Sequence, residues 1–374
     1  MRILQARTAL RLRARLQPRR VVLTDAKGEL TARDLDGITA LMHRGRTAPS
    51  ARSVPRCPPQ VAELPPDAPL RQVLATALTA GDELEMRSSG STGPPHLQRR
   101  GPLSAAQLRT LRDLARRIGL RGGASIASAA PGVHGHGLLV GLGALVLGSP
   151  LVDLSHLRPA QRVQLLHRER PQLLTGVPVH LADVLAADQE HARGRPLQIP
   201  RVISGSDVLP AALRADLARH FRARVHDVYG TTETGPIAVD GRPLAGVRIR
   251  EQDGLLIVRS PFTGGKELVT DRGHLDKQGR VRVTGRADGA VSSGGMLHDP
   301  RAVARLLVSH PGVAAVRLRV VEDERFGART VAEVTPSPGE AAVPTGQELR
   351  SLVRDRLGAA AVPREVVLLS SPGD

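Results

Sequence analysis

The sequence predicts an α/β protein with a large N-terminal α/β domain, a β-rich subdomain and a small C-terminal α+β domain. Its 374 residues are enough for two domains. From residue 84 onward, short apolar runs alternate with helical patterns, which is typical of α/β folds. Residues 247–284 then become rich in strand patterns, with turns at Asp253-Gly254 and Gln278-Gly279.

The elements follow in order along the chain. Residues 1–45 predict a helix, a short strand at 21–24 and a second helix from about residue 31. The first 20 residues are rich in arginine and lack acids, as in a transit peptide or an interfacial helix. Residues 46–70 have many Pro, Arg and Ser and no periodicity, so a loop or linker is expected there.

Four apolar runs predict central strands, and the C-terminal part predicts a compact unit. The four runs lie at 125–129, 151–154, 173–177 and 201–204. The C-terminal pattern predicts a helix near 300–309, strands at 313–321 and 329–335, a helix at 346–357 and a strand at 364–369. The apolar run 137–152 is broken by glycines and too short to span a bilayer, so a buried helix is expected.

The net charge of +17 comes almost entirely from arginine, since lysine occurs only at Lys27, Lys266 and Lys277. Such a charge suits nucleic acid or an anionic membrane. However, the arginines are scattered, and no aromatic side chains are interleaved for base stacking. A compositional bias is the preferred interpretation, which makes a nucleic-acid partner unlikely.

Cys57 is the only cysteine, so an internal disulfide and a cysteine-rich metal site are excluded. A cytoplasmic location is expected.

A run of small residues at 88–95 reads Ser-Ser-Gly-Ser-Thr-Gly-Pro-Pro. Backbone N–H groups of such a loop converge on an anion, and the hydroxyls add hydrogen bonds to phosphate oxygens. An ordinary surface turn rich in serine and glycine remains an equal alternative for this segment taken alone.

A second segment, Val-Tyr-Gly-Thr-Thr-Glu-Thr-Gly at 228–235, contains the only tyrosine of the chain, Tyr229. Its ring offers a stacking face for adenine. A threonine hydroxyl suits a phosphate, and Glu233 suits Mg²⁺, which prefers a few carboxylates together with phosphate oxygens. The alternative is a polar loop after a strand.

These two segments resemble the phosphate loop and the Tyr-Gly-x-Thr-Glu motif of the adenylate-forming superfamily of acyl-CoA synthetases and AMP-dependent ligases. Segments 201–210, 240–247, 270–273 and 284–288 resemble further landmarks of that superfamily. The resemblance implies that Asp271 binds the ribose hydroxyls, that Arg286 reaches the nucleotide and that Asp288 is the hinge. His134 or His136 would face the acyl pocket, unless it is a solvated or capping residue.

The site residues implied by the resemblance form two sets. For the nucleotide they are Ser88, Ser89, Gly90, Ser91, Thr92, Gly93, Gly205, Tyr229, Gly230, Thr231, Asp271 and Arg286. For catalysis they are Thr232, Glu233, His134 and His136, with Glu233 as the metal ligand.

Several positions depart from the superfamily pattern. His96 and Ser292 stand where a lysine is usual, and the sequence ends at Asp374, just short of the usual Gly-Lys pair. Losing one preorganised donor typically costs about 2.7–4 kcal/mol, so slow adenylation is expected. The N-terminal part is also shortened. The expected domains are 1–287 and 288–374.

The function implied is ATP-dependent activation of a carboxylic acid through an acyl-adenylate, as in an acid–CoA ligase. ATP, Mg²⁺ and CoA are the implied cofactors, with a carboxylic acid and a CoA or carrier-protein thiol as partners. Two alternatives stay open: a non-catalytic or impaired paralogue that binds nucleotide, and an arginine-rich nucleic-acid or membrane-associated protein. The scarcity of aromatics leans toward an aliphatic acid and fatty acid metabolism.

Overall fold

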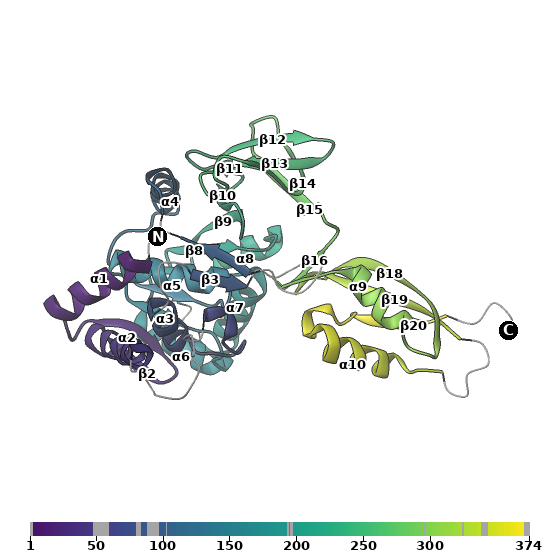
Figure 1. Ribbon diagram of the computed structural model, residues 1–374, viewed down its shortest axis with the longest axis horizontal. Helices are drawn as coiled ribbons and strands as arrows, with labels where there is room; N and C mark the ends of the chain where they lie inside the picture. Colours follow the sequence, from purple (N-terminus) through teal and green to yellow (C-terminus); the bar gives the residue numbers. More distant parts are fainter. Residues whose placement is uncertain are drawn as a thin grey trace.

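The computed structural model describes residues 3–47, 60–79, 84–87, 97–101, 103–192, 194, 197–294, 296–323, 325–337 and 343–369. The molecule is elongated, with a large body, a β-rich subdomain above it and a small domain at one side (Figure 1). This arrangement confirms the predicted α/β class with a large N-terminal domain and a small C-terminal α+β domain.

A nine-stranded sheet forms the centre of the large domain, in the order β11-β10-β9-β8-β7-β5-β6-β1-β2. Six neighbouring strands are parallel: β1 (Val21–Asp25), β5 (Ile126–Ser128), β6 (Leu151–Asp153), β7 (Leu173–Gly176), β8 (Arg201–Gly205) and β9 (Arg224–Thr231). The edges are antiparallel: β2 (Gly28–Thr31), β10 (Gly235–Val239) and β11 (Arg242–Pro243). The four predicted apolar runs became β5 to β8, because strands covered on both faces need continuous apolar sequence.

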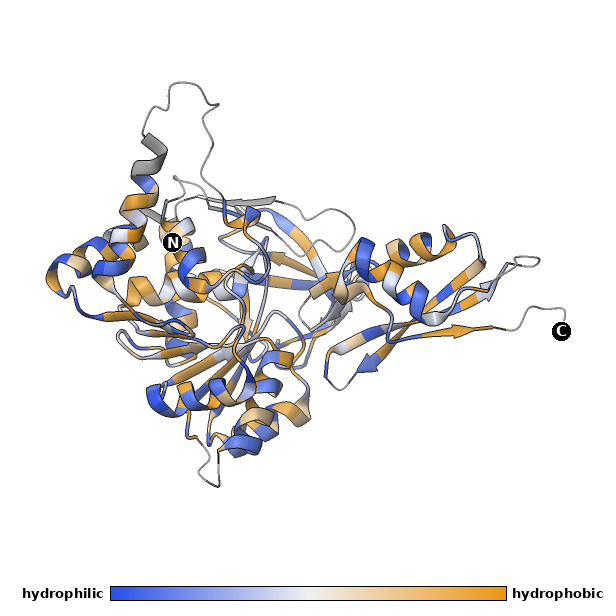
Figure 2. Ribbon diagram, turned by 90° about the horizontal axis from the view of Figure 1, so that it is seen from below, coloured by the Kyte–Doolittle hydropathy of each residue, from blue (hydrophilic) through white to orange (hydrophobic). Residues whose placement is uncertain are grey.

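Helices cover both faces of this sheet. One layer contains α1 (Ile3–Leu16), α2 (Ala32–Thr47), α3 (Leu70–Thr79) and α5 (Gly135–Leu147); the other contains α6 (Pro159–Glu169), α7 (Pro178–His191) and α8 (Ala211–His220). Successive residues of a strand point to opposite faces, so Ile126 packs in one core cluster and Ala127 in the other. Figure 2 shows the apolar residues gathered along the central strands, while most helices are half polar.

Two sequence expectations were wrong in part. The apolar run 137–152 is not one buried helix, because α5 ends at Leu147, Gly148 caps it with φ +71°, and β6 follows. Leu139 of α5 is also 44% exposed. The expected loop at 46–70 is shorter at both ends: α2 continues to Thr47, and a short 3₁₀ turn, η1 (Val61–Glu63), precedes α3.

Residues 61–70 bury apolar side chains that the proline-rich composition concealed. The buried side chains there are Val61, Ala62, Leu64, Ala68 and Leu70. Proline and serine indicated an irregular backbone correctly, but irregular backbone can still contribute to a core when its few apolar residues face inward.

The β-rich subdomain is a four-stranded antiparallel sheet of β12 (Arg248–Gln252), β13 (Leu255–Arg259), β14 (Glu267–Leu275) and β15 (Val281–Arg286). Asp253 and Gly254 both have positive φ in the tight β12–β13 turn, as the Asp-Gly pair predicts. A helix before it, α4 (Ala105–Arg117), packs near β10.

The small domain contains a five-stranded sheet and two helices around its own core. Its strands are β16 (Val291–Ser293), β17 (Met296–His298), β18 (Val313–Asp323), β19 (Gly327–Pro336) and β20 (Glu365–Leu368), and its helices are α9 (Pro300–Val308) and α10 (Gly346–Leu357), followed by the 3₁₀ turn η2 (Ala359–Ala361). Arg325 donates to Asp183 of α7 at 3.0 Å, which links this domain to the large one. Among the described residues, no helix has the length and apolar character needed to cross a bilayer.

Candidate active site

The predicted site residues gather at the carboxyl edge of the parallel strands. Gly205 ends β8, and Tyr229 to Thr231 end β9. After β5 come His134, the N-cap of α5, and His136 in the first turn of that helix. Carboxyl ends of parallel strands meet at one edge of a sheet, where ligands of open α/β folds usually bind. Gly205 pairs with Val228 in register, so these two segments are direct neighbours.

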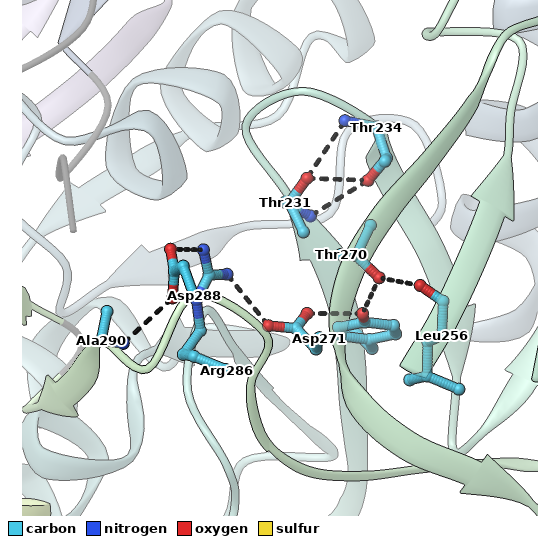
Figure 3. Close-up of polar contacts among 9 residues, drawn as sticks. Thr231, Thr234, Leu256, Thr270, Asp271, Arg286, Asp288 and Ala290 are labelled. Carbon is cyan, nitrogen blue, oxygen red and sulfur yellow. Dashed lines mark hydrogen bonds and ion pairs between the residues drawn. The ribbon is translucent and has the colours of Figure 1, made fainter. Parts of the chain in front are cut away.

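Tyr229, Asp271 and Arg286 form one hydrogen-bonded cluster (Figure 3). The Tyr229 hydroxyl donates to Asp271 Oδ2 at 2.6 Å and lies 2.9 Å from Thr270 Oγ1. Arg286 donates to Asp271 Oδ1 at 3.0 Å and to Asp288 Oδ2 at 3.1 Å. Asp271 and Arg286 are register partners of β14 and β15, so the hairpin itself brings them together.

The Asp271 carboxyl is only 3% exposed. Burial raises its pKa, while the bonds from Tyr229 and Arg286 act in the opposite direction. Burial, followed by the nearby Asp271 charge, raises the pKa of Tyr229 far above its usual value, so its hydroxyl stays a donor. The Asp271 carboxyl is therefore a preformed acceptor held by two donors, one from β9 and one from β15.

The turn between β9 and β10 is closed by two threonines. Thr234 N donates to Thr231 Oγ1 at 3.2 Å, and the two hydroxyl oxygens lie 3.0 Å apart. Gly230 allows this close turn, because a β-carbon there would lie 2.6 Å from the carbonyl oxygen of Gly235. Glu233 is exposed at the tip, and its negative charge is felt by Arg286.

His136 connects three strand ends. Its Nε2 lies 2.9 Å from Thr175 Oγ1, and its Nδ1 lies 3.3 Å from Ser206 Oγ. Burial is the main cause that lowers the pKa of His136 to about 4, so the ring is neutral at physiological pH. His134 is instead the N-cap of α5, with an exposed side chain that makes no capping hydrogen bond.

Two further histidines at the same edge were missed in the sequence. His156 follows β6 and His180 follows β7, and the charges of His134 and His156 are felt by His180. Burial lowers the pKa of His180 to about 4, and its buried Nδ1 has no hydrogen-bond partner in the described part of the chain. Their place two or three residues past each predicted strand was the available signal.

Part of the predicted site lies outside the described residues, namely the phosphate loop with Ser88, Ser89, Gly90, Ser91, Thr92 and Gly93. The flanking strands β3 (Leu84–Arg87) and β4 (Leu97–Arg100) pair antiparallel, with Arg87 opposite Leu97.

Among the described residues, no group of three or more His, Cys, Asp or Glu side chains could hold a metal ion. A single carboxylate such as Glu233 still fits Mg²⁺ when phosphate oxygens and water complete its shell.

Comparisons with known proteins bear on this geometry. The family model described as AMP-binding enzyme matches residues 86–254, and the model of the AMP-binding enzyme C-terminal domain matches residues 302–372. A probable 2-succinylbenzoate–CoA ligase of Mycobacterium tuberculosis is 30% identical over 324 residues, which cover 78% of this chain and 82% of that protein.

Two solved structures share the fold. An amide bond synthetase from Marinactinospora thermotolerans superimposes with a TM-score of 0.76 at 21% identity, covering 99% of this chain and 96% of that one. A malonyl-CoA ligase, solved with methylmalonyl-CoA and AMP bound, gives a TM-score of 0.67 at 25% identity, covering 94% and 96%. The chain therefore belongs to the family of AMP-binding, adenylate-forming enzymes that contains the acyl- and aryl-CoA ligases.

Proposed function

We propose that this protein is an acid–CoA ligase that activates a carboxylic acid as its acyl-adenylate and then transfers the acyl group to CoA. The observation that carries the proposal is the buried cluster of Tyr229, Asp271 and Arg286 at the carboxyl edge of the sheet. The two family matches, which together cover most of the chain, support it. CoA is preferred over a carrier thiol because the 30% identical relative is named a CoA ligase.

In the first half-reaction, a carboxylate oxygen of the acid bonds to the α-phosphorus of ATP and pyrophosphate leaves. Asp271 would accept hydrogen bonds from the ribose hydroxyls with its remaining lone pairs, since each oxygen already receives one protein donor. Thr232 and the phosphate loop would donate to phosphate oxygens. Mg²⁺ bound near Glu233 would supply positive charge where negative charge gathers.

In the second half-reaction, the thiol sulfur of CoA bonds to the acyl carbon and AMP leaves. We propose domains of residues 1–287 and 288–374, with Asp288 as the pivot between the steps. Asp288 lies between β15 and β16, accepts a hydrogen bond from Ala290 N at 3.0 Å, and precedes Gly289, whose φ is +75°.

The acid is proposed to carry a second polar group. His136, His180, Thr175 and Ser206 make the edge beside Gly205 polar, in contrast to the purely aliphatic lining expected from composition. A buried His180 nitrogen without a partner costs free energy that a substrate oxygen would recover. The relative named as a 2-succinylbenzoate–CoA ligase acts on an acid of this kind.

The test is a panel of acids in an assay of pyrophosphate release, followed by detection of the CoA thioester. The panel contains 2-succinylbenzoate, 4-chlorobenzoate, a malonate and a fatty acid, with Glu233→Gln as the impaired variant. Glu267→Gln is the matched control, since Glu267 is an exposed carboxylate on β14 whose ion pair with Arg250 lies on the surface. We expect Glu233→Gln to lose pyrophosphate release and Glu267→Gln to keep it. If the wild-type protein binds nucleotide but releases no pyrophosphate with any acid of the panel, the result favours a non-catalytic paralogue.

A further inference from the structure

The opposite edge of the central sheet carries an unusual distribution of charge. In the described loops and first residues that enter the six parallel strands (17–20, 118–125, 148–150, 170–172, 197–201 and 221–224), there is no aspartate or glutamate. The arginines of these segments are Arg19, Arg20, Arg121, Arg170, Arg201, Arg222 and Arg224. This edge is therefore uniformly basic, while the catalytic edge contains Asp207, Asp271 and Glu233.

Two parts of this edge are concave. One, of about 480 Å³, lies before β1 and is lined by Gln17, Pro18, Arg19 and Arg20. The other, of about 440 Å³, lies where the end of α4 meets the start of β8 and has more arginines in its lining. Four arginines line it, together with Ala115, Gly119 and Leu120: Arg112, Arg116, Arg121 and Arg201. The only acidic residue of the adjoining turn of α4 is Asp113, which is buried and already paired with Arg116 and Arg117 at 2.7 and 2.9 Å. The lining thus keeps a strong positive charge.

The side chain of Arg201 packs closely against one wall of this cavity. Its guanidinium lies against the backbone of Gly119, so closely that a β-carbon at residue 119 would be 2.4 Å from Arg201 Nε. Gly119 has φ +67° and ends α4, which leaves room for the planar group. Arg201 is half-buried, yet none of its donors has a hydrogen-bond acceptor or ion-pair partner in the described part of the chain.

The attraction of arginine to helix C-termini explains only part of this cluster. It accounts for Arg116 and Arg117, which lie in the last turn of α4 and pair with Asp113. It does not account for Arg112, Arg121 and Arg201, whose guanidinium groups have no hydrogen-bond acceptor among the described residues. Guanidinium groups of this kind bind phosphate oxygens through two parallel hydrogen bonds.

We infer that this cavity is a second anion site, separate from the catalytic edge, for a small ligand that carries two or three linked phosphates. The volume of the cavity suits a small molecule, and the arginines that line it suit several phosphate oxygens at once. The site lies at the amino ends of the strands, whereas the proposed catalytic site lies at their carboxyl ends. Its occupation is therefore independent of the proposed function.

The experiment is calorimetric titration of the full chain with inorganic tripolyphosphate. The readout is the difference between wild type and variants, because the catalytic phosphate loop also binds this probe. Arg201→Gln and Arg121→Gln should each weaken one binding event by roughly 10–100-fold, the effect of one lost charged hydrogen bond. Arg121 is exposed, so its variant tests the site even if Arg201→Gln folds poorly.

Arg222→Gln is the charge-matched control, because Arg222 is exposed on the same edge at the entrance of β9, outside both cavities. This control variant should bind tripolyphosphate as tightly as wild type does. Every variant should also bind AMP with the affinity of wild type. Equal weakening by Arg222→Gln would mean diffuse attraction only and would overturn the site. If mixed-sequence RNA binds more tightly than tripolyphosphate, and if Arg201→Gln and Arg121→Gln both lose this binding, the surface is assigned to nucleic acid instead.

Discussion

At the residue scale, Asp271 shows how a carboxylate can be buried and still available. Two protein donors hold one lone pair on each oxygen, and the two donors come from different elements, β9 and β15. Desolvation alone would favour the neutral acid, whereas charge-assisted bonds stabilise the anion and fix its orientation. A carboxylate in this state has a fixed orientation before any ligand binds.

Asp271→Ala should weaken AMP and ATP binding by a similar factor, roughly 10–100-fold, because both nucleotides carry the same ribose. Equilibrium dialysis with labelled AMP and ATP measures this. Glu267→Ala, an exposed carboxylate of the same strand, is the control and should bind like wild type. Weaker ATP binding with normal AMP binding would instead assign Asp271 to the phosphates or to the metal.

At the scale of elements, Asp188 joins three segments of one helical layer. It is fully buried on α7, and its oxygens accept from His167 of α6 at 2.9 Å and from His220 of α8 at 2.8 Å. The backbone N–H of Leu197, on the path from α7 to β8, is a third donor at 3.2 Å. These bonds hold α6, α7 and α8 to one another on one face of the central sheet.

Asp188→Asn should lower the free energy of unfolding by about 3 kcal/mol, since the amide nitrogen cannot accept from a histidine donor. Urea unfolding followed by circular dichroism measures the loss. Asp216→Asn on α8 is the control: its pair with Arg219 is largely exposed, so a change near zero is expected. A similar, small change in both variants would show that the Asp188 bonds contribute little net stability.

The sequence predicted these elements better than the contacts between them. The β8 strand and the β14–β15 hairpin follow from local patterns, whereas the choice of Asp271 and Arg286 as site residues came from the resemblance to the superfamily. The Tyr229–Asp271 bond joins residues 42 positions apart and depends on how two sheets pack. Sequence periodicity does not say which side chains from distant segments meet. His180 was missed as a site residue for the same reason.

At the scale of the whole molecule, buried histidines couple stability to pH. His136 and His180 have pKa values of about 4 when folded, against 6.5 as ordinary side chains. Between these values the unfolded chain binds their protons and the folded chain does not, so stability decreases as pH falls from 6.5 toward 4. Asp227, whose pKa burial raises to about 6, acts in the opposite sense above its ordinary 3.8.

Two histidines outweigh one aspartate, so the urea midpoint should decrease across this range. His180→Gln should make the decrease shallower, and Asp227→Asn should make it steeper. Urea titrations at pH values above 6.5 and near 4 measure both slopes. Parallel curves for wild type and His180→Gln would show that His180 keeps an ordinary pKa in the folded protein.

The contact between Arg325 and Asp183 offers a way to test domain movement. Asp183→Cys and Arg325→Cys, in a Cys57→Ser background, should be joined by a short bismaleimide, because the native side chains already meet at 3.0 Å. If the domains must rotate between half-reactions, the joined protein should keep one half-reaction and lose multiple turnover. Each single-cysteine variant, treated in the same way, is the control. Full turnover in the joined protein would exclude an obligatory rotation.

The scarcity of aromatic residues has a spectroscopic consequence. The chain has no tryptophan, and Tyr229 is its only tyrosine, so the strongest near-ultraviolet signals of the protein come from one ring. That ring is bonded to Asp271 and Thr270, in the cluster proposed to bind the nucleotide. Tyrosine emission therefore reports the state of this single location without a label, while near-ultraviolet dichroism adds only the weak bands of three phenylalanines.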